Sequence, residues 1–158
     1  ALQEPGALEA AASTNVPVCL MHMKGQPRTM QNNPEYNDII KEVSHFLMER
    51  AGACEQAGIP QESILFDPGY GFGKSLEHNY ALVKHLPCIM SLGYPVLVGM
   101  SRKSMIGNLL NRKVDERLAG SISLATIVAQ MGAQIIRVHD VKETADAVNI
   151  VKMLNTIE

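Results

Sequence analysis

Short apolar runs alternate with longer segments of helical period along the whole chain. Four such runs predict strands at residues 18–21, 64–66, 96–98 and 135–138. The polar segment 24–36 contains one glycine and two prolines, which predicts a mobile loop. Apolar positions three and four residues apart predict helices at 5–12, 38–58, 75–93 with a break at Pro87, from 104, at 115–131 and at 142–154.

This alternation of strand and helix predicts an α/β fold. Strands that are separated by helices pair in parallel through right-handed crossovers. The continuous apolar character of the four runs is typical of strands that are buried on both faces. With 158 residues the chain has the size of one domain, and we expect a single domain over residues 1–158.

Composition excludes several classes of function. The formal net charge of −2 provides no basic field for nucleic acid. No apolar run reaches the roughly 18 residues of a membrane span, and no secretory signal is visible. The cysteines Cys19, Cys54 and Cys88 lie in apolar contexts, which predicts reduced, buried thiols and a cytoplasmic protein.

Polar residues gather where the predicted strands end. The four ends are Met21-His22-Met23, Asp67-Pro68-Gly69, the segment 99–104 and the segment 137–140. In parallel sheets of this kind, ligands bind at the carboxyl ends of the strands. We therefore expect these segments to form one rim that holds a small polar ligand.

Asp67 is the candidate anchor for that ligand. A carboxylate accepts two parallel hydrogen bonds from a flat pair of N–H groups, as on an amino-pyrimidine ring. A carboxylate that only caps the following loop is the alternative. The loop contains three glycines and ends at Lys74, but the phosphate-binding P-loop pattern does not fit, because Pro68 occupies the position of its first glycine.

The segment 99–104 offers three further contacts. Gly99 allows a ligand to approach the backbone closely. Lys103 can donate to a ring oxygen or nitrogen, and the helix that begins near Ser104 presents free N–H groups that suit a carboxylate. The alternative is a capped surface helix with solvated cations.

Arg137 and His139 suit a phosphate or a diphosphate. They are two residues apart, so a strand would place both side chains on the same face, and a guanidinium group binds phosphate oxygens in pairs. We expect Asp140 to cap the final helix. Met21 is either a core residue or a contact to a flat ring, and His22 also allows both interpretations.

Together these residues resemble dihydropteroate synthase of the bacterial type. The resemblance rests on the motifs Asp67-Pro-Gly-Tyr-Gly-Phe-Gly-Lys74, Gly99-Met-Ser-Arg-Lys-Ser104 and Arg137-Val-His-Asp140, in this order. It implies the C-terminal half of a TIM (β/α)₈ barrel. It also implies a transferase of folate biosynthesis, which condenses p-aminobenzoate with 6-hydroxymethyl-7,8-dihydropterin diphosphate to give 7,8-dihydropteroate and pyrophosphate.

The resemblance further implies a role for each site residue. Asp67 and Lys103 would hold the pterin ring, in a pocket lined by Met21 and Gly99. The remaining members of the set would hold the other groups: Phe72 and Ser104 p-aminobenzoate, and Arg137 and His139 the diphosphate. The family implies Mg²⁺ at the diphosphate, sulfonamides as inhibitors and a homodimer. No covalent nucleophile and no protein-built metal cluster are expected.

Two alternatives stay open. The family's first half carries a Gly-Glu-Ser-Thr-Arg loop and other site residues that do not occur in these 158 residues, so the chain alone is expected to be inactive if it needs them. It would then be a non-catalytic half-barrel that binds pterin or phosphate. A pterin-dependent methyltransferase is a further candidate, but it would not require Arg137 and His139.

Overall fold

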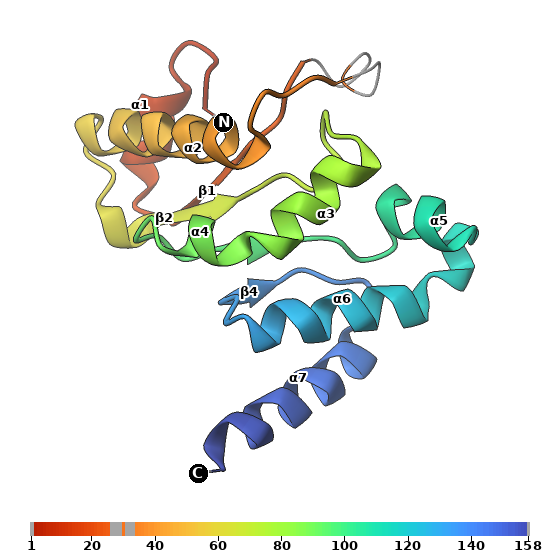
Figure 1. Cartoon of the computed structure of the whole chain (residues 1–158). Helices are drawn as coiled ribbons and strands as arrows, with labels where there is room; N and C mark the ends of the chain where they lie inside the picture. The colour runs from red at the N-terminus through yellow and green to blue at the C-terminus, as the bar shows by residue number, and fades with distance from the viewer. Residues whose placement is uncertain (1, 26–29, 31–33, 158) are drawn as a thin grey trace.

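The computed structural model describes residues 2–25, 30 and 34–157, so part of the predicted loop at 24–36 lies outside the described residues. The elements follow the predicted order (Figure 1). The strands are β1 (Val18–Met21), β2 (Ile64–Asp67), β3 (Leu97–Val98) and β4 (Ile135–Ile136). The helices are α1 (Ala7–Thr14), α2 (Ile39–Gln56), α3 (Leu76–Lys84), α4 (Leu86–Met90), α5 (Ser104–Leu110), α6 (Leu118–Gln130) and α7 (Val141–Thr156), with short 3₁₀ turns η1 (Gln61–Ser63) and η2 (Val114–Glu116).

The strands pair in parallel and in chain order. β1 pairs with β2, and β3 pairs with β4. A parallel bridge between Phe66 and Val96 joins the two pairs. Because all four strands run in the same direction, their carboxyl ends lie along one edge, as predicted.

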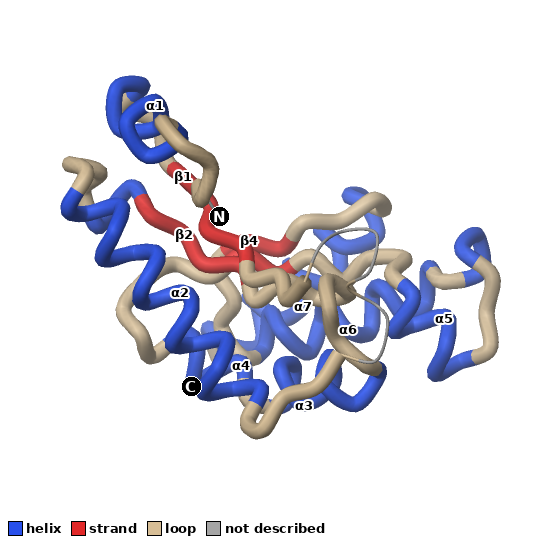
Figure 2. Tube along the Cα trace, turned by 90° about the horizontal axis from the view of Figure 1, so that it is seen from above, coloured by secondary structure: helices blue, strands red, loops and turns tan. Residues whose placement is uncertain are grey.

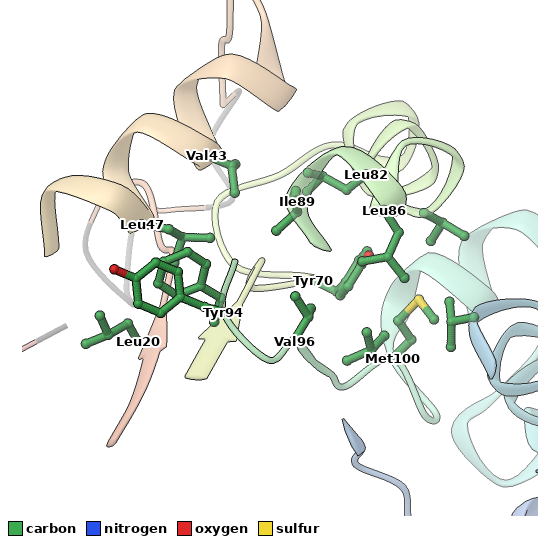
Figure 3. Packing of buried hydrophobic residues seen from close by; sticks show 14 of the residues in the cluster. Leu20, Val43, Leu47, Tyr70, Leu82, Leu86, Ile89, Tyr94, Val96 and Met100 are labelled. Atoms are coloured by element: carbon green, nitrogen blue, oxygen red, sulfur yellow. The ribbon is translucent and has the colours of Figure 1, made fainter. Parts of the chain in front are cut away.

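Helices cover one side of these strands. Figure 2 shows α2, α3, α4 and α6 on the same side of the strand layer. α2 packs on β1 and on α3 and α4, and α6 packs against α7. The buried cluster between helices and strands has Leu20, Leu47 and Tyr94 at one end and Tyr70 and Met100 at the other (Figure 3).

Two predicted boundaries are wrong. β4 is two residues long rather than four, although the backbone N–H of Arg137 continues the pairing by donating to the Val98 carbonyl (2.9 Å). The predicted helix 115–131 is divided into η2 and α6. The break falls at Arg117, whose side chain donates to the carbonyls of Arg102 (2.8 Å) and Arg112 (3.1 Å). The predicted break near Pro87 is confirmed, because α3 ends at Lys84 and α4 begins at Leu86.

The cysteines also depart from prediction. All three are free thiols, but only Cys54 is buried, whereas Cys19 and Cys88 are exposed. Cys19 precedes the fully buried Leu20 on β1, so its side chain lies on the face of the strand opposite to the buried cluster. In the described part of the chain no helix is both long and apolar enough to cross a membrane.

Candidate functional site

The glycine loop after β2 is pressed against the chain that leaves β1. Gly69 and Gly73 have φ angles of 71° and 63°. A Cβ atom at Gly69 would lie 1.8 Å from the His22 carbonyl oxygen, and one at Gly73 would lie 2.3 Å from the Lys24 carbonyl oxygen. Only glycine combines this backbone conformation with such close approach. The two glycines therefore allow the loop to pack directly on the chain that follows β1.

Asp67 ends β2, and the β1–β2 register places it beside Met21. One oxygen, Oδ1, accepts a hydrogen bond from the backbone N–H of Gly69 (2.7 Å). Burial raises the pKa of Asp67, while the Gly69 bond and the cations Lys103, Lys74 and Arg137 act in the opposite direction. The carboxylate therefore lies in a partly desolvated place that faces positive charge.

Lys103 contacts the glycine loop from the other side. Its Nζ donates to the Tyr70 carbonyl oxygen (2.6 Å) and lies 4.7 Å from the centre of the Phe72 ring. Burial lowers the pKa of Lys103; Asp67 raises it and Arg137 lowers it further. Lys103 thus links the loop that follows β2 with the loop that follows β3.

A hollow of about 440 Å³ opens between the ends of β3 and β4. Its lining includes Gly99, Lys103, Arg137 and His139, which are four of the predicted site residues. Arg137 is close to Gly99, since a Cβ atom added there would lie 3.9 Å from Arg137 Cβ. The buried hydroxyl of Ser101 lies 3.1 Å from His139 Nδ1 and accepts from the His139 backbone N–H (3.2 Å).

The structure therefore brings most of the predicted residues to one rim. Asp67, Lys103 and Arg137 lie close enough for their charges to act on one another. Met21 borders this group through its pairing with Asp67. Ser104 is exposed at the first position of α5 and is not part of the lining of the hollow.

Asp140 does not act as predicted. It is the residue before α7, but its carboxylate makes no capping hydrogen bond. Both of its oxygens instead accept from the guanidinium group of Arg102, which lowers the pKa of Asp140. Arg102 has a φ of 58° and its backbone N–H donates to Ser121 Oγ (2.9 Å). This ion pair joins the β3 and β4 loops that carry Lys103 and Arg137.

Lys74 and His22 have structural roles that the sequence did not reveal. Lys74 is 3% exposed and His22 is 5% exposed, and Lys74 Nζ lies 2.9 Å from His22 Nδ1. Burial is the main cause that lowers the pKa of Lys74 to about 7 and that of His22 to about 3. In the sequence, only the position of Lys74 at the end of a glycine loop indicates a role for this residue.

Metal ions in proteins need a set of suitable side-chain ligands. Among the residues that the structure describes, no group of three or more His, Cys, Asp or Glu side chains could hold a metal ion. Of the carboxylates at the rim, Asp140 is engaged by Arg102 and Asp67 accepts from Gly69. The rim is therefore suited to recognition by hydrogen bonds and charge.

Comparison with known proteins agrees with this geometry. A family model described as "Pterin binding enzyme" matches residues 1–139. Dihydropteroate synthase of Escherichia coli (strain K12) is 58% identical over 151 residues, which are 96% of this chain and 54% of that protein. The chain thus spans about half the length of this relative.

Solved structures extend the likeness to the fold. Yersinia pestis dihydropteroate synthase with a sulfonamide drug complex has a TM-score of 0.96 at 53% identity, over 98% of this chain and 56% of that one. The Xanthomonas albilineans enzyme with 7,8-dihydropteroate has a TM-score of 0.91 at 44% identity, over 99% and 57%. The same enzyme with 4-aminobenzoic acid has a TM-score of 0.92 at 45% identity, over 99% and 55%.

These likenesses confirm the predicted fold class, namely parallel β/α units that form part of a TIM barrel and cover about half of such enzymes. The matched part of the chain includes the strand-end residues Asp67, Lys103 and Arg137. The chain belongs to the pterin-binding enzyme family, and within it the chain is similar to about half the length of dihydropteroate synthases.

Proposed function

We propose that this chain provides the substrate-binding rim of a dihydropteroate synthase, a transferase of folate biosynthesis. The observation that carries the proposal is the meeting of Asp67, Lys103 and Arg137 at the carboxyl ends of three different strands. A carboxylate and two cations at one rim suit a substrate that combines a flat N–H-bearing ring with an anionic leaving group.

The pterin ring would bind between Asp67 and Lys103. Because Gly69 holds Oδ1 of Asp67 in place, the carboxylate presents Oδ2 and the remaining lone pair of Oδ1 to the N–H pair of the pyrimidine edge. The Lys103 ammonium group would donate to a ring oxygen or nitrogen. Met21 and Gly99 would border the ring, since Met21 pairs with Asp67 and Gly99 lines the adjoining hollow.

The diphosphate would bind at Arg137 and His139. Both line the hollow of about 440 Å³ that also contains Lys103. The guanidinium fork offers paired donors to phosphate oxygens, and the Ser101 hydroxyl lies 3.1 Å from Nδ1 of the His139 imidazole, which it can hold in place. This placement puts the leaving group and the pterin ring at neighbouring parts of one rim.

The incoming p-aminobenzoate would contact Phe72 and the beginning of α5 at Ser104. In the reaction the bond between the pterin methylene carbon and the diphosphate oxygen breaks, and its electron pair leaves with pyrophosphate. The arylamine nitrogen forms the new bond to that carbon and loses a proton. The chain's residues therefore act by aligning the amine and by stabilising the departing negative charge.

Mg²⁺ remains a proposal taken from the resemblance alone. The described residues do not offer it a ligand set, so we derive no step of the reaction through it. It enters the assay below as a variable. The cytoplasmic location, the homodimer and the sensitivity to sulfonamides are likewise proposals for this chain.

A second candidate function is favoured by the length of the match. Because the chain spans about half of the dihydropteroate synthases that it resembles, it would supply only part of their site. It would then bind the pterin or the diphosphate without catalysing the condensation.

One experiment separates the two functions. The purified chain is incubated with both substrates, with and without Mg²⁺, and dihydropteroate is measured by chromatography. Product formation supports the enzyme. Pterin binding without product supports the binding half-site, and the lack of both would contradict the proposed function.

A further inference from the structure

Lys74 has no role in the binding scheme above, although it is one of the most deeply buried polar residues described. Its ammonium nitrogen is 2.8 Å from the Gly69 carbonyl oxygen, 3.0 Å from the Phe72 carbonyl oxygen and 2.9 Å from His22 Nδ1. A fourth, longer contact of 3.5 Å joins it to the His22 carbonyl oxygen. The three shorter contacts match the three N–H donors of an ammonium group. The imidazole of His22 is neutral at pH 7, because burial lowers its pKa to about 3.

Burial of an ammonium group lowers the stability of a fold more than burial of an apolar group of the same size. Transfer of a charge out of water is unfavourable unless hydrogen bonds replace the lost hydration, and here burial lowers the pKa of Lys74. An apolar side chain would fill the same volume without that cost. We therefore expect Lys74 to act through the groups with which it forms hydrogen bonds.

The held groups belong to the loop that carries the site. The buried Lys74 binds the loop carbonyls of Gly69 and Phe72. Lys103, which is only partly buried, binds the Tyr70 carbonyl (2.6 Å). Two lysines thus bind carbonyls of the same glycine loop, and the aromatic ring of Phe72 lies against Lys103.

The bond to His22 extends this arrangement to a second strand end. His22 follows β1, and its backbone N–H donates to the Asp67 carbonyl (3.0 Å). A loop rich in glycine has many accessible conformations, so a fixed geometry needs a partner outside the loop. Lys74 provides that partner by joining the loop to the residue after β1.

We propose that Lys74 is a positioning residue whose side-chain nitrogen, through its hydrogen bonds, fixes the glycine loop, and with it the Phe72 ring, against Lys103. The identity of the bound ligand rests on the proposed function. The binding of the glycine loop by Lys74, which we call the clamp, rests on the contacts described above. Asp67 is held by β2 and by Gly69 N–H. Loss of the clamp is therefore expected to affect the Phe72 side of the site more than the pterin side.

The first test needs no ligand. Backbone amide hydrogen exchange is compared in the 158-residue chain carrying Lys74→Met and in a matched control, Lys84→Met, which makes the same change at an exposed position of α3. We expect exchange at residues 69–73 to become about tenfold faster in Lys74→Met, with exchange in α2 unchanged. Unchanged exchange at 69–73, or an equal increase throughout the chain, would overturn the proposal.

The second test separates positioning from general stability through the two ligands. In Lys74→Met, the Kd for p-aminobenzoate should rise about tenfold, while the Kd for 6-hydroxymethyl-7,8-dihydropterin rises less than about threefold. Equal losses for both ligands would contradict the proposal. If the unaltered chain binds neither ligand, the proposed function fails, and hydrogen exchange still decides whether the clamp exists.

A second pair of variants covers the case in which Lys74→Met does not fold. His22→Asn places an amide oxygen near the position of Nδ1, whereas His22→Leu removes the acceptor. Faster exchange at 69–73 in His22→Leu, with little change in His22→Asn, supports the clamp. Identical exchange in these two variants would refute it.

Discussion

The change of Asp67 to asparagine separates recognition of the pterin from stability of the fold. Gly69 N–H donates to Oδ1 (2.7 Å), and the amide oxygen of the variant can keep that bond. The amide nitrogen then takes the place of Oδ2 and directs N–H donors at the donors of the pterin ring. Recognition of the pterin is therefore lost, while the backbone N–H of Gly69 keeps its hydrogen-bond acceptor.

The magnitude follows from the bonds that are exchanged. One charge-assisted hydrogen bond disappears, at about 1.5–3 kcal/mol, and a buried donor of the ligand loses its partner, at about 1–3 kcal/mol. A net loss of about 3 kcal/mol corresponds to a Kd about 100-fold higher. Binding is measured by titration calorimetry with 6-hydroxymethyl-7,8-dihydropterin.

Stability should respond differently and with a defined sign. Burial raises the pKa of Asp67 above its ordinary value of 3.8. The protonated carboxyl group therefore suits the fold better, and its contribution to stability, full below pH 3.8, is lost as the pH rises through the folded-state pKa. In Asp67→Asn, the free energy of unfolding from urea titrations should thus decline less over this range of pH.

A matched control is Asp146→Asn, which alters an exposed carboxylate on α7. It should leave ligand binding unchanged, because this side chain lies on α7, away from the strand-end rim. Pterin affinity of Asp67→Asn equal to that of the unaltered chain would refute the role of Asp67 as the anchor. In the unaltered chain, pterin affinity should fall as the pH is lowered through the raised pKa of Asp67, since protonation removes an acceptor.

Three further predictions concern the diphosphate site and the core. Arg137→Ala should raise the Kd for the pterin diphosphate about tenfold and leave the Kd for the pterin alcohol unchanged, and equal effects in calorimetry would contradict the assignment. Tyr70→Phe should raise the free energy of unfolding by about 1 kcal/mol, because the buried Tyr70 hydroxyl has no hydrogen-bond partner among the described residues; a loss in urea titrations would show a partner. Leu47→Ala should lower it by about 2–5 kcal/mol, since Leu47 is fully buried, and a loss below 1 kcal/mol would place Leu47 outside the core.

Much of the rim could be predicted because the signals for its residues lie in their immediate sequence neighbours. Asp67 is marked by the apolar run before it and by the glycines after it, and parallel strands bring their ends together. The same reasoning placed Lys103 and Arg137 after their strands. The structure places these three residues close enough for their charges to act on one another, while their roles toward substrate stay predictions.

The errors come from contacts between distant residues. Asp140 was expected to cap α7, but its partner Arg102 lies 38 positions away in sequence. Lys74 is 52 positions from His22, so its burial could not be seen from the loop alone. Cys19 was expected to be buried because its neighbours are apolar, but it is exposed on the face of β1 opposite to the buried Leu20.

One rim at the strand ends is proposed to bind both the pterin and its diphosphate. The most direct test of this proposal is a titration of the ¹⁵N-labelled chain with 6-hydroxymethyl-7,8-dihydropterin diphosphate, followed by NMR. We predict that the backbone amide shifts concentrate at residues 67–73, 99–104 and 137–139. Shifts confined to residues of α6 and α7, or no shifts with the ligand in large excess, would contradict this proposal.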